Sequence, residues 1–194
     1  MSALSTFIKT YNTRRTQYQL KKALPQGVTI EQVQSIVQEF VKHTPTSFNM
    51  QSLRAVVITG ALHEAVWKAV ADALPTDDAK RRPLSAKDEA YGSVIFFDDS
   101  TTIKGMQEKF AVYADYFPIF AATSNGAAQI NTWAAIGELG LGGHLQHYNP
   151  FVEAALKGKV PESWTVQAQL VFGVPTAEAG PKQFIENEVK VLSE

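Results

Sequence analysis

The chain has 194 residues, of which 45% are hydrophobic and 19% charged, the composition of an ordinary globular protein rather than a disordered or fibrous one. Its 18 basic and 19 acidic residues give a formal net charge of −1, so no long-range field would attract nucleic acid or an anionic membrane. Cysteine is absent, which excludes disulfides, thiolate metal sites and cysteine nucleophiles. At this length we expect a single domain over residues 1–194.

Nothing in the sequence indicates export or membrane insertion. Residues 1–7 lack a basic region followed by an apolar core, so they are not expected to act as a secretory signal. The longest apolar runs are far shorter than the ~20 residues that a helix needs to span a bilayer. A cytoplasmic location is therefore expected, with no membrane partner.

Hydrophobic periodicity and helix breakers predict a mixed series of helices and strands. The clearest helix begins after Thr29, which forms a capping-box pattern with Gln32, and ends before Pro45. In chain order, the predicted elements are a polar helix before residue 14, a helix over 30–42, a strand over 55–58, a helix over 61–74, a solvated connection with short helical pieces over 75–89, a strand over 93–97, a helix over 102–116 interrupted near Pro118, a helix from Ser124 or Asn125 to Leu139, a short extended segment after Gly143, a helix over 152–156 and a strand over 165–172.

The order of these elements indicates the fold class. Helices and strands do not alternate strictly, which favours an α+β sandwich over a regular doubly wound fold. The run 93–97 is continuously apolar, as expected for a strand covered on both faces.

Two polar segments about thirty residues apart could together hold one ligand. Thr13-Arg14-Arg15-Thr16 offers two guanidinium groups beside a hydroxyl, which suits a phosphate. In the turn 44–51, the side-chain amides of Asn49 and Gln51 can each donate and accept hydrogen bonds, as the edge of a flavin ring requires. Flavin mononucleotide (FMN) has this combination of an anionic end and a polar ring. The alternatives are a solvated basic turn and ordinary loop capping.

The glycine-rich run Gly140-Leu141-Gly142-Gly143 is not a dinucleotide fingerprint, because it lacks the spacing and follows a helix. Glycine backbone can nevertheless approach a planar ring closely. A helix C-cap explains the first glycine equally well.

The histidines do not predict a metal site. His144 and His147 would lie on opposite faces of an extended segment, and no nearby carboxylate completes a ligand set. His63 is predicted to lie on a surface helix beside Glu64, and we assign it no function. No Gly-x-Ser-x-Gly elbow or Walker-type loop occurs, so neither a serine hydrolase nor a P-loop enzyme is supported.

An aromatic cluster surrounds Pro118. Tyr116 and Phe117 belong to this cluster, which either packs in the core or lines a slot for an aromatic substrate.

Taken in chain order, four segments resemble the FMN-dependent nitroreductase family. They are the Arg-Arg-Thr-Gln-Tyr box at 14–18, the Pro-Thr-Ser-Phe-Asn-Met-Gln-Ser-Leu-Arg segment at 45–54, the Ala-Ala-Ile-Gly-Glu-Leu-Gly-Leu-Gly segment at 134–142, and Gly-Val-Pro at 173–175 with Pro181-Lys182 after it. Tyr18 stands where many members have a second arginine, and Ser52-Leu53 replaces a Pro-Trp pair. The Arg-Arg-Thr-x-Tyr pattern resembles the short fungal and bacterial branch, whose fungal members are linked to fatty-acid signalling.

The resemblance implies a three-layer sandwich with a mostly antiparallel sheet, assembled as an intertwined homodimer with two FMN sites at the subunit interface. Arg14, Arg15 and Lys182 would contact the phosphate, with Thr16 nearby. The other implied cofactor contacts are Asn49 and Gln51 to the ring or ribityl chain, Pro45, Thr46 and Ser47 from the partner subunit, and Gly142 and Gly143 near the ring.

The leading functional hypothesis is an NAD(P)H oxidoreductase that reduces nitroaromatics or quinones by a ping-pong hydride mechanism. Flavin N5 carries the chemistry, so no catalytic side chain is expected. NADH or NADPH is the electron donor, and a small aromatic molecule is the acceptor. Tyr18 and Ser52-Leu53 motivate an alternative, a flavin-binding regulator of lipid or redox signalling with little turnover. A flavin-free structural dimer is a third possibility.

Overall fold

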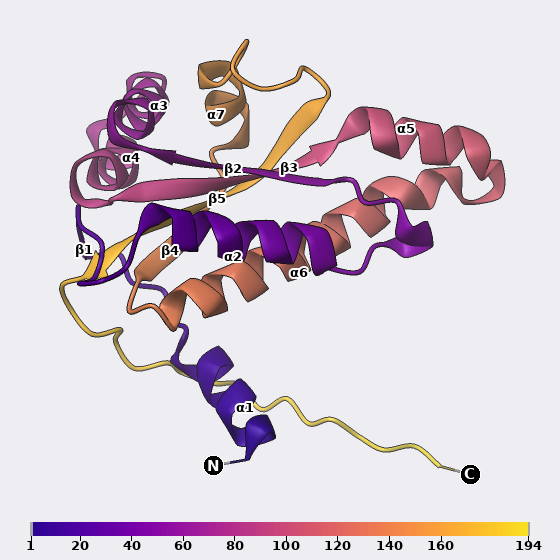
Figure 1. Cartoon of the computed structure of the whole chain (residues 1–194), viewed down its shortest axis with the longest axis horizontal. Helices are drawn as coiled ribbons and strands as arrows, with labels where there is room; N and C mark the ends of the chain where they lie inside the picture. The colour runs from indigo at the N-terminus through magenta and orange to yellow at the C-terminus, as the bar shows by residue number, and fades with distance from the viewer. Residues whose placement is uncertain (1, 194) are drawn as a thin grey trace.

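The computed structural model describes residues 2–193 (Figure 1). The elements in chain order are α1 (Ala3–Thr13), β1 (Leu20–Lys21), α2 (Ile30–His43), η1 (Ser47–Asn49), β2 (Leu53–Thr59), α3 (Gly60–Asp72), α4 (Asp77–Glu89), β3 (Gly92–Asp99), α5 (Ser100–Lys109), η2 (Ala111–Tyr116), α6 (Phe117–Gly137), β4 (Gly142–Gln146), α7 (Asn149–Ala155) and β5 (Trp164–Pro175).

The five strands form one antiparallel sheet in which β5 is the longest strand. The ladder runs β1-β5-β3-β2, and β4 also pairs with β5. Val94 of β3 lies opposite Leu170 of β5 and opposite Val57 of β2, so β3 is hydrogen-bonded along both edges. β5 runs to Pro175, three residues beyond the predicted strand, because its end pairs with β1.

The side chains of β3 explain why helices cover both faces of the sheet. Val94 and Phe96 pack in a cluster with residues of α2 and α6. Ile95 and Phe97 point the other way and pack with residues of α3 and α7. In Figure 1, α2 and α6 lie on one side of the sheet and α3, α4 and α7 on the other. The predicted α+β three-layer sandwich is confirmed, with β3 buried on both faces.

Helix α2 matches its prediction because its start is encoded locally. The Thr29 hydroxyl accepts from the Gln32 backbone N–H at 3.4 Å, and Gln32 Oε1 accepts from the Thr29 N–H at 2.9 Å. The helix then ends next to Thr44-Pro45, as predicted.

The prediction of short helical pieces over 75–89 is wrong, because α4 is one continuous helix of 13 residues. Its Thr76 cap accepts from the Ala79 N–H at 3.2 Å, and Asp77 and Asp78 complement the helix dipole in the first turn. Pro83 lies inside the helix and is buried, so packing compensates for the hydrogen bond that proline cannot donate.

The predicted start of the next long helix at Ser124 or Asn125 is also wrong. α6 begins at Phe117 and holds Pro118 in its first turn, where a missing N–H costs little. Asn125 is buried inside α6 and donates to the Phe97 carbonyl at 3.1 Å and to Asp98 Oδ1 at 2.9 Å. Its polar side chain therefore anchors the helix to β3 instead of capping it.

His63 was expected on a surface helix, yet its side chain is fully buried in α3. Because a carbonyl can only accept, His63 Nε2 donates to the Ala86 carbonyl, at 2.8 Å. The Ser93 hydroxyl donates to Nδ1 at 3.2 Å and accepts from Trp67 Nε1 at 3.0 Å. The imidazole thus joins α3, α4 and β3 as a neutral ring, and burial lowers its pKa from the ordinary value.

Both ends of the chain extend from this body (Figure 1). α1 has no buried residue, and no helix or strand follows β5 up to residue 193. Within residues 2–193, none of the helices has the length and apolar character that crossing a membrane requires.

The lowered pKa of His63 predicts a pH-dependent stability. In the unfolded chain His63 takes up a proton below about pH 6.5, whereas the folded chain resists it, so the free energy of unfolding should fall as the pH drops below that value. Between pH 8 and pH 5, the free energy of unfolding measured with urea should change less with pH in His63→Gln than in the unmodified chain. His147→Gln is the matched control, because His147 is exposed. If the free energy of unfolding changes equally with pH in His63→Gln and in the unmodified chain, this assignment is wrong.

Candidate functional site

The two arginines of the predicted phosphate clamp line a cavity of about 200 Å³ between the end of α1, the end of α6 and the end of β5. The Arg14 guanidinium lies over the ring of Trp133, 4.3 Å from its centroid. Arg14 Nε is buried and has no hydrogen-bond partner in the protein. An arginine with a buried donor left unpaired is unusual in a folded protein.

The electrostatics of this cavity favour an anion. Burial and the adjacent charge of Arg15 lower the pKa of Arg14, but an arginine remains charged at neutral pH. Glu138 also lines the cavity. Within residues 2–193, no carboxylate lies within ion-pair distance of Arg14 or Arg15. The two positive charges are therefore not neutralised by the protein itself.

The glycines predicted near the ring lie beside the same segment. Thr16 forms a parallel bridge with Gly143, and the Gln17 N–H donates to the Gly143 carbonyl at 2.8 Å. A Cβ at Gly143 would come within 2.5 Å of the Val171 carbonyl oxygen, and one at Gly142 within 2.6 Å of Gln17 Oε1. Glycine is thus required here for close packing, and it allows residues 16 and 17 to lie against Gly143.

The C-terminal tail passes over this region. Arg15 Nη2 donates to the Gly180 carbonyl at 2.8 Å, and a groove of about 290 Å³ lies between residues 16–19 and 177–180. Lys182 follows two residues later and is exposed. The tail therefore brings Lys182 toward the arginines along the chain, although its side chain contacts Phe184 rather than the cavity.

Sequence reasoning missed a stack of three side chains next to the clamp. The guanidinium of Arg82, from α4, lies 3.9 Å from the centroid of the Tyr18 ring. His144 lies 5.2 Å from the same ring, is almost fully buried, and has a pKa lowered to about 3 by burial and by the Arg82 charge. Arg82 thus places a cation beside the position where the family box usually has arginine. Nothing in the local sequence could indicate this contact, since 64 residues separate Arg82 from Tyr18.

The two histidines considered as metal ligands do lie apart, His144 buried and His147 exposed. Within residues 2–193, no group of three or more His, Asp or Glu side chains is arranged to hold a metal ion.

The second predicted segment, at 45–51, forms η1 and a strained turn. Phe48, Asn49 and Gln51 have φ values of 57°, 51° and 51°. Each such non-glycine residue costs about 1–3 kcal/mol, and this strain persists only where surrounding contacts enforce it. Asn49 and Gln51 are exposed, so their amide groups are available to a ligand.

An aromatic surface adjoins this turn. Phe48 packs against Phe110, Tyr113 and Phe117, with ring centroids 4.7 to 5.5 Å apart. Phe117 is fully buried beneath Phe48, whereas Tyr116 is 54% exposed. Of the two predicted substrate contacts, Tyr116 faces solvent and Phe117 supports the surface from below.

The two halves of the predicted ligand site lie at opposite ends of α6. Phe117 packs under the turn and Trp133 packs under Arg14. At ~1.5 Å per residue, the helix between them is about 24 Å long. One chain therefore does not bring Arg14 and Arg15 together with Asn49 and Gln51.

The comparisons with known proteins agree with the fold. A model of the nitroreductase family matches residues 12–174. The Saccharomyces cerevisiae protein HBN1 is 52% identical over 193 residues, covering the whole of both chains. A crystal structure of a nitroreductase from Saccharomyces cerevisiae is 50% identical, with a TM-score of 0.85 over 87% of this chain and 95% of the other.

More distant structures have been solved with small molecules bound. Nitroreductase CinD from Lactococcus lactis, in complexes with chloramphenicol and 4-nitrophenol, is 39% and 38% identical, with TM-scores of 0.84 and 0.80 over 93% of this chain and 95% of that one. A structure from Exiguobacterium sibiricum in complex with FMN is 13% identical and shares the fold, with a TM-score of 0.72 over 93% of both chains. The chain belongs to the nitroreductase family, a family of oxidoreductases.

Proposed function

We propose that the chain is an FMN-dependent NAD(P)H oxidoreductase that reduces nitroaromatics or quinones and works as a homodimer. The observation that carries the proposal is the cavity lined by Arg14 and Arg15, two cations that form no ion pair within residues 2–193 and therefore suit a phosphate. The FMN complex of the structural neighbour from Exiguobacterium sibiricum supports the choice of cofactor.

The residues of this site fit the rest of FMN only if two chains contribute. Arg14, Arg15, Thr16 and Lys182 would hold the phosphate end, with Gly142 and Gly143 beside the ring. The turn that carries Asn49 and Gln51 lies too far away on the same chain. Pro45, Thr46, Ser47, Asn49 and Gln51 of a second copy would complete the site.

Exposed apolar side chains at both ends of the chain support a homodimer. α1 exposes Leu4, Phe7 and Ile8, and the C-terminal tail exposes Phe184, Ile185, Val189, Val191 and Leu192. Apolar groups gathered on extended segments indicate an interface with another chain. The intertwined arrangement implied by the family would bury them against the partner.

Bound FMN would supply the redox chemistry, taking hydride from NADH or NADPH and returning electrons to the acceptor. The chain itself would bind and orient. Arg82 would add positive charge next to Tyr18. A positive charge near the site would stabilise the flavin ring when reduction makes it anionic. The exposed aromatic surface of Phe48, Tyr113 and Tyr116 suits the flat ring of an aromatic acceptor, and the two compounds bound by CinD each contain a nitrophenyl ring.

The first test is the visible absorption spectrum of the purified chain before and after anaerobic addition of NADH or NADPH. We expect a flavin spectrum that bleaches with the nucleotide, because the donor reduces bound FMN. Bound flavin that does not bleach would favour the flavin-binding regulator instead. A colourless chain that takes up no added FMN would contradict the proposal altogether.

A second test asks whether each site is shared between two chains. Arg14→Ala with Arg15→Ala, and separately Asn49→Ala with Gln51→Ala, should each weaken FMN binding, the arginine pair at least tenfold, since a charge-assisted hydrogen bond contributes roughly 1.5–3 kcal/mol. Refolding the two variants together should restore roughly one intact site in four, because half of the dimers are mixed and each mixed dimer has one undamaged site. FMN titration measures the recovered sites.

Each variant refolded alone is the control for this mixing experiment and should recover no intact site. If both variants lose FMN and their mixture recovers nothing, the site is not shared between subunits.

A further inference from the structure

The strained turn at 48–51 needs contacts that hold it, and the structure shows two sets. On one side, the aromatic ring of Phe48 is fixed among Phe110, Tyr113 and Phe117. The backbone is then closed on itself, because the Thr46 hydroxyl accepts from the Gln51 N–H at 3.0 Å. These contacts fix the start of the turn but leave the Gln51 carbonyl to be held from elsewhere.

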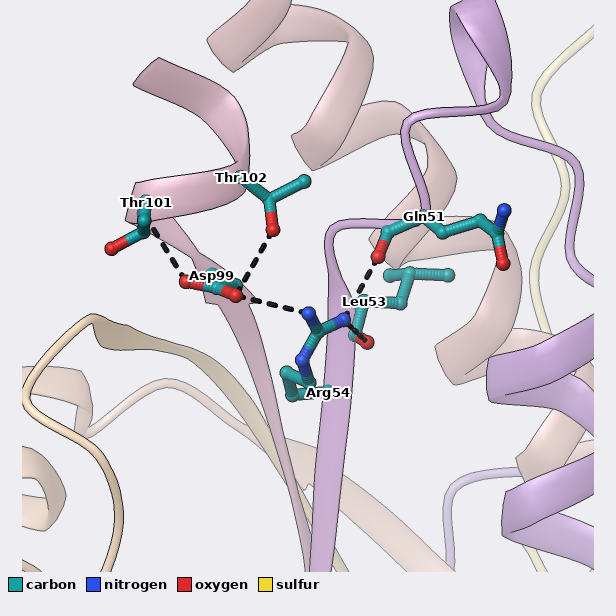
Figure 2. A network of polar contacts seen from close by, with 6 residues as sticks. All are labelled: Gln51, Leu53, Arg54, Asp99, Thr101 and Thr102. Carbon is teal, nitrogen blue, oxygen red and sulfur yellow. Dashed lines mark hydrogen bonds and ion pairs between the residues drawn. The ribbon is translucent and has the colours of Figure 1, made fainter. Parts of the chain in front are cut away.

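Arg54 holds that carbonyl (Figure 2). Its Nη1 donates to the Gln51 carbonyl at 2.8 Å and also to the Leu53 carbonyl at 2.8 Å. Its Nη2 forms an ion pair with Asp99 Oδ2 at 2.9 Å. One planar guanidinium therefore connects the end of the turn to the far end of β3, and the single ammonium of a lysine could not reproduce this arrangement.

Asp99 is itself held in place, so it provides a firm anchor. It caps α5, accepting from the Thr101 N–H at 3.1 Å and from the Thr102 hydroxyl at 3.0 Å (Figure 2). Burial alone would raise the pKa of Asp99, but hydrogen bonds from Ser163, Thr102 and Thr101, together with the Arg54 charge, outweigh it and lower the pKa. The carboxylate is therefore charged at neutral pH, where it pairs with Arg54.

We propose that Arg54 is a positioning residue that, through the Gln51 carbonyl and Asp99, sets the strained turn in the conformation that the ligand site uses. The proposal rests on the proposed function, since the turn matters to a ligand only if Asn49 and Gln51 face one. Arg54 reaches the turn through the hydrogen bonds that it donates to the Gln51 and Leu53 carbonyls.

The physical effect expected of Arg54 is preorganisation. A turn already held in its strained conformation loses little freedom when it meets FMN, whereas a relaxed turn must be ordered at the expense of affinity. Loss of Arg54 should therefore weaken binding without removing any group that touches the ligand.

The test compares Arg54→Lys with the unmodified chain in two measurements. Hydrogen exchange of the backbone amides at 48–51 should become at least tenfold faster, because the turn is released. The dissociation constant for FMN, from fluorescence titration, should rise about tenfold. Arg81→Lys is the matched control: it makes the same chemical change in an exposed ion pair with Asp78, and should alter neither measurement.

A merely structural role for Arg54 would lower the unfolding temperature and leave FMN affinity unchanged in the folded chain, which would overturn the proposal. Unchanged exchange at 48–51 would also overturn it, and this readout does not depend on FMN binding. If the unmodified chain takes up no FMN while Arg54→Lys still releases the turn, the proposed function fails and the hold of Arg54 on the turn stands. Asp99→Asn removes the anchoring charge but keeps an acceptor, and should shift both measurements in the same direction by less.

Discussion

Strand β3 is buried along both faces and hydrogen-bonded along both edges, so it requires a helical layer on each side and a strand on each flank. The alternating side chains of Val94, Ile95, Phe96 and Phe97 assign α2 and α6 to one layer and α3 and α7 to the other. Polar contacts reinforce this arrangement at both ends of the strand, through Ser93 toward His63 and through Asp98 toward Asn125. The positions of Arg14 and of the turn at 48–51 follow from it, since both pack on α6.

What could be predicted from the sequence was largely what neighbouring residues determine. The start of α2 depends on Thr29 and Gln32, three residues apart, and the double-sided burial of β3 is visible in its own apolar run. The pair Arg14-Arg15 could be recognised as a clamp because its chemistry lies in two adjacent side chains. The resemblance to nitroreductases added the order of the segments and the division of the site between chains.

The predictions that failed depend on contacts between distant segments. Pro83 reads locally as a helix breaker, but burial keeps it inside α4. Asn125 reads as a cap, but its partner is Asp98 on β3. His63 stands beside charged Glu64 in a helix and looks exposed, although Ala86 and Ser93 bury and satisfy it. Arg54 ends the segment that resembles the family, but the sequence does not indicate its contacts with the Gln51 carbonyl and Asp99 (Figure 2).

The stack of Arg82 on Tyr18 has a consequence for how this branch of the family can change. An arginine at position 18 would lose the cation–π contact with Arg82 and would bring a second positive charge near it, and like charges repel each other. The two positions are therefore coupled, although they lie on different elements. We expect an arginine at position 18 to be better tolerated when position 82 is uncharged.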